Sequence, residues 1–254
     1  MLVARSSLPR SFVIKTSISS EKLEKGVNQN HATQGVGGHR QRLRQRFLKC
    51  SKSMPDYELL ELLLFSVFSR KDTKPLAKAL LNKCGSLKGV IFSNDNTIRA
   101  VNGCGESVSF LMQLLKEIIC RISLETVQKE QIISSNIHVI EYYQKLLSLE
   151  QKEQFRVMFL NSRGRLIAEE QMQHGTVDQT PIYPREVMQR ALENGASAII
   201  LVHNHPSGLA KPSRQDIEIT KQLNDVAKKL DIKVLDHIII SKNGSYSFAD
   251  NRLL

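Results

Sequence analysis

Residues 198–206 read Ala198-Ile199-Ile200-Leu201-Val202-His203-Asn204-His205-Pro206, a short apolar run followed at once by two histidines. The run is rich in β-branched residues and therefore predicts a buried strand. Side chains alternate along a strand, so His203 and His205 point the same way from its end. Pro206, Gly208 and Pro212 then force a loop. The stretch predicts a strand that ends in two neighbouring imidazoles.

A helix is expected directly after this loop. Ser213 can cap it, and Asp216 falls in its first turn. This geometry brings Asp216 back towards the two imidazoles at the strand end. Two neutral imidazoles and one carboxylate suit zinc, and three protein ligands leave a fourth position for water. The spacing therefore predicts a catalytic site with Zn²⁺ as cofactor, held by His203, His205 and Asp216.

The same spacing resembles the JAMM (MPN+) metallopeptidase motif, His-x-His-Pro, six residues, then Ser-x-x-Asp. Other segments narrow the resemblance to the bacterial RadC family: Gly175-Thr176, Pro184-Arg185-Glu186-Val187, His203-Asn204-His205-Pro206-Ser207-Gly208 and Leu235-Asp236-His237. The resemblance extends from about Gly38 to the C-terminus. It implies a mixed sheet flanked by helices and a zinc-dependent hydrolase.

The resemblance also implies two catalytic groups. Ser213 matches the family serine, whose hydroxyl helps to hold an oxyanion, and it can serve as a helix N-cap at the same time. The base in JAMM proteins is a glutamate from an earlier strand, and Glu153 stands immediately before a predicted strand at 155–160. Glu186 is the alternative base, although an acid at a helix start is common because it favours the helix dipole. His237 can support a metal ligand, although a lone histidine at a strand start is more often structural.

The second half of the chain alternates between predicted helices and strands. This pattern predicts a domain of α+β or α/β class over residues 132–254, and the resemblance implies that it is a JAMM/MPN domain. Helices are expected at 137–149, 184–193 and 213–230, and strands at 155–160, 165–172, 198–202, 232–235, 238–240 and 246–248.

The first half is predicted to be helical over residues 39–127, with helices at 39–48, 56–68, 74–83 and within 97–122. The turn at 101–105 resembles a helix-hairpin-helix element and precedes an apolar period through Phe110, Leu114 and Ile118. Its glycines would let backbone N–H groups approach a DNA phosphate. Glu106 would repel that phosphate, so a structural αα-hairpin is the preferred interpretation.

Positive charge is concentrated at the N-terminus. The formal net charge is +11, and residues 1–54 alone carry eleven Lys/Arg against two acids, a net +9. Residues 1–38 are polar and lack an apolar period, which predicts a disordered basic arm. A predicted helix follows, on which alternate positions point to different sides and do not form one stripe. It carries Arg40, Arg42, Arg44 and Arg46. They are either a solvated helix end or a weak, salt-sensitive nucleic-acid contact.

Composition narrows the class of protein further. No apolar run approaches the roughly 20 residues that span a membrane. The four cysteines form no Cys-x-x-Cys pair, which is typical of free thiols in a reducing cytoplasm. No cysteine follows Cys120, so a zinc deaminase is excluded. We therefore expect a cytoplasmic metallopeptidase-type hydrolase that cleaves a peptide or isopeptide bond in a peptide or protein substrate. The alternative is a DNA-associated repair or recombination accessory protein without proteolytic activity.

Overall fold

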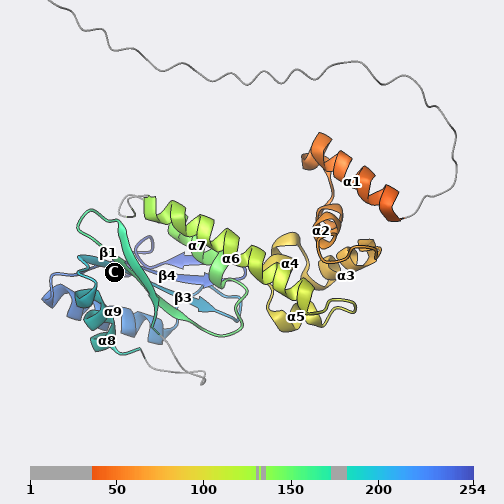
Figure 1. The fold of residues 1–254 in the computed structure, drawn as a ribbon. Coiled ribbons are helices and arrows are strands. Elements are labelled where there is room, and N and C mark those ends of the chain that lie inside the picture. The colour runs from red at the N-terminus through yellow and green to blue at the C-terminus, as the bar shows by residue number, and fades with distance from the viewer. Residues whose placement is uncertain (1–35, 130–131, 133–135, 173–181) are drawn as a thin grey trace, which may run out of the picture. The chain divides into compact units, whose positions relative to one another are not determined.

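A computed structural model describes residues 36–129, 132, 136–172 and 182–254 (Figure 1). The chain from Gly35 to Leu254 forms one compact unit, distinct from Met1–Gln34. Most of the predicted disordered arm, residues 1–38, lies outside the described residues. Its last three residues do not fit that prediction, because helix α1 already begins at Val36.

Helices make up the first half of the described chain, as predicted. They are α1 (Val36–Cys50), a short 3₁₀ turn (Ser51–Ser53), α2 (Asp56–Leu64), α3 (Lys74–Cys84), α4 (Leu87–Phe92), α5 (Asp95–Arg99) and α6 (Glu106–Lys129). Leucines and valines from α2 to α6 share one core, which includes Leu60, Leu80 and Val108. Helix α1 joins through Leu43, which packs with Met54 and Phe65.

A short turn connects α5 to α6 and forms the predicted αα-hairpin. Gly103 in this turn has a φ of +88°, and a Cβ there would lie 3.2 Å from Lys71 Nζ. The turn therefore depends on a glycine. Helix α6 is present, but the apolar residues whose spacing predicts it do not face the core. Phe110, Leu114 and Ile118 are exposed, whereas Met112 and Cys120 are among the buried residues of α6.

The second half folds around one mixed sheet. Its elements are α7 (Ile137–Leu147), β1 (Phe155–Leu160), β2 (Leu166–Gln171), α8 (Pro184–Glu193), β3 (Ala198–His205), α9 (Arg214–Lys229), β4 (Lys233–Ser241) and β5 (Gly244–Ser247). The strand order is β2-β1-β3-β4-β5. Only the β3–β4 pair is parallel, and the other three pairs are antiparallel. The predicted fold class, helices followed by a mixed sheet flanked by helices, is confirmed.

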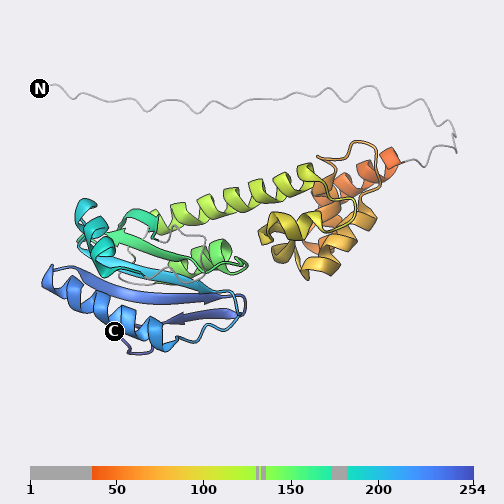
Figure 2. The ribbon, with the colours of Figure 1, turned by 90° about the horizontal axis from the view of Figure 1, so that it is seen from below.

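Both faces of the sheet are covered, so its central strands are apolar on both sides (Figures 1 and 2). Met158, Ile200 and Ile238 pack against α7 on one face. Val157 and Leu201 pack against α8 and α9 on the other. The alternation along β3 places His203 and His205 on the same face as Leu201, towards α9.

The prediction of two separate strands at 232–235 and 238–240 is wrong, because β4 runs unbroken through Asp236 and His237. An irregularity in the β3–β4 register lets Ile199 pair with Val234 and Ile200 with Asp236, so Leu235 is the extra residue of a bulge. A bulge shifts the alternation of side chains by one position. The shift sends His237 to the α9 face, where the two strand-end histidines also lie.

Within the part of the chain that the structure describes, no helix combines the length and the apolar character needed to cross a membrane.

Candidate metal centre

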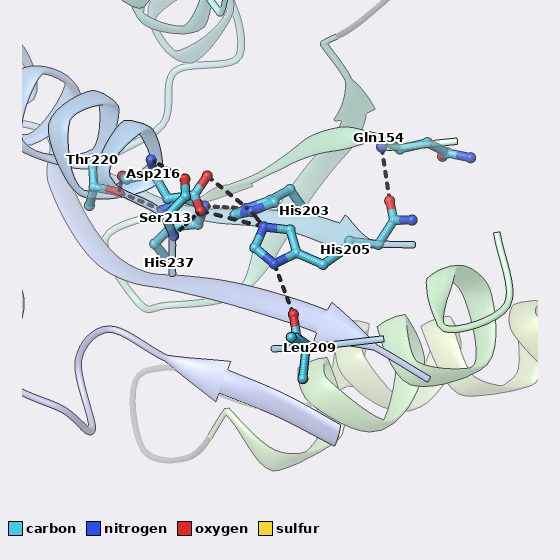
Figure 3. A network of polar contacts seen from close by, with 9 residues as sticks. Gln154, His203, His205, Leu209, Ser213, Asp216, Thr220 and His237 are labelled. Carbon is cyan, nitrogen blue, oxygen red and sulfur yellow. Dashed lines mark hydrogen bonds and ion pairs between the residues drawn. The ribbon is translucent and has the colours of Figure 1, made fainter. Parts of the chain in front are cut away.

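Four side chains meet where β3 ends and α9 begins. Glu153, His203, His205 and Asp216 each offer one nitrogen or oxygen atom, and these atoms all lie within 4.8 Å of one another. His203 Nε2 lies 2.9 Å from His205 Nε2, and the two nitrogens lie 3.3 and 3.4 Å from the Asp216 carboxylate oxygens (Figure 3). The edges of a zinc tetrahedron with bonds near 2.1 Å measure roughly 3.4 Å. The separations therefore fit one ion between the three predicted ligands.

A backbone carbonyl sets the orientation of the His205 ring. His205 Nδ1 lies 2.9 Å from the carbonyl oxygen of Leu209, which can accept a hydrogen bond but cannot donate one (Figure 3). Nδ1 is therefore protonated in neutral His205, and Nε2 keeps the lone pair that faces Asp216. The Pro206–Gly208 turn returns the chain to this position, since Gly208 N donates to His205 O at 3.1 Å. The loop after β3 thus leaves the unprotonated nitrogen of neutral His205 directed towards the cluster.

A buried chain of hydrogen bonds fixes the His203 ring in the same way (Figure 3). Thr220 Oγ1 donates to the backbone oxygen of Asp216 at 2.5 Å, so it accepts from His237 Nδ1, also at 2.5 Å. His237 Nε2 is then unprotonated and accepts from His203 Nδ1 at 2.7 Å. His203 Nε2 is left with its lone pair towards His205 and Asp216. Polar partners of this kind hold ligand histidines in the tautomer that a metal requires.

Burial keeps His237 neutral and suits it to this role. The pKa of His237 is held well below its usual value, first by desolvation and then by the charge of His203. Burial alone would raise the pKa of Asp216, but the hydrogen bonds that His203 and His205 donate to the carboxylate when their rings are protonated outweigh it and hold that pKa well below its usual range. The hydrogen bond to Asp216 is also the main cause of a raised pKa at His205. The site thus pairs an ionised carboxylate with two imidazoles.

Ser213 and Asp216 also cap α9. The Ser213 hydroxyl oxygen accepts from Asp216 N at 3.1 Å, and Asp216 Oδ2 accepts from Ser213 N at 2.6 Å. This capping box fixes the helix start and holds the Asp216 carboxylate at the strand end. The N-cap interpretation of Ser213 is thus confirmed. Its hydroxyl proton is not used by the box, so a role towards a bound oxyanion is compatible with capping.

Asn204 binds the segment that carries Glu153. Its side chain points to the opposite face from the two histidines, as the alternation of β3 requires. Asn204 Oδ1 accepts from Gln154 N at 2.8 Å, and Asn204 Nδ2 donates to Lys152 O at 3.0 Å. Both backbone neighbours of Glu153 are therefore tied to the residue between the two histidines. This arrangement places an exposed glutamate at the edge of the histidine–aspartate cluster.

The alternative base, Glu186, lies in the first turn of α8 and is not part of this cluster. Gly175-Thr176 lies outside the described residues. Of the four arginines of α1, two have structural partners: Arg40 stacks on the Phe65 ring at 4.4 Å, and Arg46 pairs with Glu58 at 2.8 Å. Arg42 and Arg44 are exposed. A nucleic-acid contact by this run remains a prediction.

A mixed sheet flanked by helices, with two histidines and an aspartate clustered at the end of one strand, is typical of a JAB/MPN-type domain. Residues 133–253 match the family model of the RadC-like JAB domain. The predicted resemblance to the RadC family is confirmed over these residues.

Two residues of the site were not assigned a function from the sequence. Thr220 lies one helical turn after Asp216 and therefore on the same face of α9, which is a spacing that could have identified it. In the sequence, Asn204 is distinguished only by its position between two histidines. Its partners are backbone atoms of a segment about 50 positions earlier, so no pattern in the sequence reveals them.

Proposed function

We propose that the C-terminal domain is a zinc-dependent hydrolase of metallopeptidase type, which cleaves a peptide or isopeptide bond. The observation that carries this proposal is the cluster of Glu153, His203, His205 and Asp216. Its donor set, two imidazoles and a carboxylate, suits zinc and leaves coordination positions open. Zinc bound there would polarise the scissile carbonyl and increase the acidity of a water molecule.

The chain's own residues supply the remaining chemistry. Glu153 lies at the exposed side of the cluster and takes the proton of the attacking water, and it can return this proton to the leaving amine. The Ser213 hydroxyl donates a hydrogen bond to the oxyanion that forms from the carbonyl. Asp216 stays ionised, and His237 keeps the His203 ring in place. Asn204 holds Glu153 where it can reach the water.

The test is a cleavage assay with the full chain on a library of peptides and lysine-linked isopeptides. Chelation should abolish cleavage, and Zn²⁺ added back should restore it. Glu153→Gln should bind zinc and leave the library intact. Cleavage that survives complete removal of the metal would contradict the proposal, and cleavage by Glu153→Gln at the wild-type rate would contradict the role of Glu153 as the base.

The DNA-associated alternative has its own support in two exposed arginines. Arg42 and Arg44 carry positive charge on the solvent side of α1 and favour a weak contact with nucleic acid that is independent of base sequence. Such a contact is compatible with hydrolysis at the metal centre.

The four cysteines are unpaired in the structure, and this favours a reducing compartment such as the cytoplasm.

A further inference from the structure

A cleft of about 400 Å³ lies away from the candidate metal centre. One side comes from the end of α3, from α4 and from the start of α5. The other comes from the segment after α7 and from the β4–β5 turn. None of Glu153, His203, His205 and Asp216 lines it. The volume is within the range of about 300–1,000 Å³ that is typical of small-ligand sites.

The cleft is positively charged. Lys83, Lys88 and Lys242 line it, and none of its lining residues, all of them described, is acidic. The three lysines are exposed, and none forms an ion pair or a side-chain hydrogen bond with any residue that the structure describes. Three unneutralised ammonium groups from three separate elements face one space. An anion with several negative charges complements them better than a single carboxylate.

Hydrogen-bond donors accompany the lysines. Ser148 lines the cleft, is only 7 % exposed, and its hydroxyl has no partner in the structure. A buried hydroxyl without a partner is uncommon, and a ligand oxygen would satisfy it. Ser86 and Asn94 use their side-chain oxygens to accept from Gly89 N and Thr97 N, at 3.0 and 2.8 Å. Their hydroxyl and amide protons remain as donors.

We infer that this cleft binds a ligand with more than one phosphate group. Lysines, hydroxyls and amides donate to phosphate oxygens, and the total charge matches a polyphosphate or a short stretch of phosphodiester backbone. No aromatic side chain lines the cleft to stack on a base, since its lining residues are aliphatic, polar or basic. The cleft therefore recognises phosphate rather than base identity. A free polyphosphate and a nucleic-acid strand share this chemistry.

The test measures binding of inorganic tripolyphosphate to the full chain by calorimetry at low salt. The triple variant Lys83→Gln, Lys88→Gln, Lys242→Gln should weaken binding by roughly tenfold or more, since charge-assisted hydrogen bonds are lost. The matched control neutralises three exposed lysines of α9, Lys221, Lys228 and Lys229, and should bind like the wild type. Ser148→Ala should weaken binding several-fold without lowering the melting temperature, because it removes a hydroxyl that has no partner in the free protein.

An oligothymidylate, titrated against the same proteins, distinguishes the two ligand sources. If the oligonucleotide displaces tripolyphosphate and loses affinity in the cleft variant, the ligand is a strand. If tripolyphosphate alone binds, the ligand is a small polyphosphate. Both results support the inference. No binding of either probe, or equal losses in the cleft variant and in the α9 control, would overturn it.

Discussion

Asn204 Oδ1 lies 2.8 Å from the backbone nitrogen of Gln154, and this hydrogen bond links β3, the strand that ends in the two histidines, to the residue that follows Glu153. A second bond joins Asn204 to the carbonyl of Lys152 at 3.0 Å. Because Asn204 stands between His203 and His205, one short segment fixes the two imidazoles and the candidate base at the same time. The distance between the Glu153 segment and the two imidazoles is therefore set by β3 itself.

Asn204→Ala should keep its zinc but lose most of its turnover, since Glu153 would no longer be held near the cluster. It should also cost about 1–3 kcal/mol of unfolding free energy, because two backbone groups lose their partner. Zinc content, cleavage rate and denaturant unfolding check this. The control is Asn161→Ala in the β1–β2 turn, because the Asn161 side chain also forms two hydrogen bonds to backbone groups, in its case the N–H groups of Arg163 and Arg165. Wild-type turnover in Asn204→Ala would contradict the positioning role.

Glu153→Gln should retain zinc and reduce the cleavage rate by about 10²–10⁴-fold, because only the proton acceptor is removed. Glu186→Gln is the matched control and should cleave at close to the wild-type rate, since Glu186 lies outside the cluster. The ratio of kcat values for the two variants is the measurement. If Glu153→Gln were fully active and Glu186→Gln inactive, the base would be Glu186.

Thr220→Val and His237→Gln should each weaken zinc binding by roughly 10–100-fold, because both break the chain of bonds that fixes the His203 ring. Zinc affinity measured by competition with a chelator checks this. Thr126→Val on α6 is a suitable control, since Thr126 also donates to a backbone oxygen four residues earlier. Wild-type zinc affinity in both site variants would show that the ring needs no such support.

Binding to DNA should be independent of sequence, fade with salt and depend on the N-terminal basic residues. The charge of residues 1–54 suggests their deletion as the test, but Leu43 and Met54 are buried against Phe65, so the deletion would also remove part of the core. The sharper variant is therefore Arg42→Gln with Arg44→Gln, which removes two exposed charges and should reduce the salt slope by about 2. Salt-resistant binding, or an unchanged slope, would contradict this prediction.

The sequence predicted the parts of the site that depend on local spacing. The bounds of β1 follow from a short apolar run, and the common direction of the strand-end histidines follows from the alternation of side chains along a strand. The first-turn position of Asp216 follows from the capping pattern at Ser213. What it did not predict depends on register and on contacts between distant segments. The bulge at Leu235 shifts the alternation and brings His237 to the α9 face. The exposed position of Phe110 on α6 depends equally on which neighbours the helix meets.

The proposed function depends on a zinc ion held by His203, His205 and Asp216. Its most direct test is elemental analysis of the folded chain purified without chelators, beside the double variant His203→Ala, His205→Ala. We expect one zinc per chain in the wild type and none in the variant. A folded wild-type chain without zinc, or equal zinc in both proteins, would contradict it.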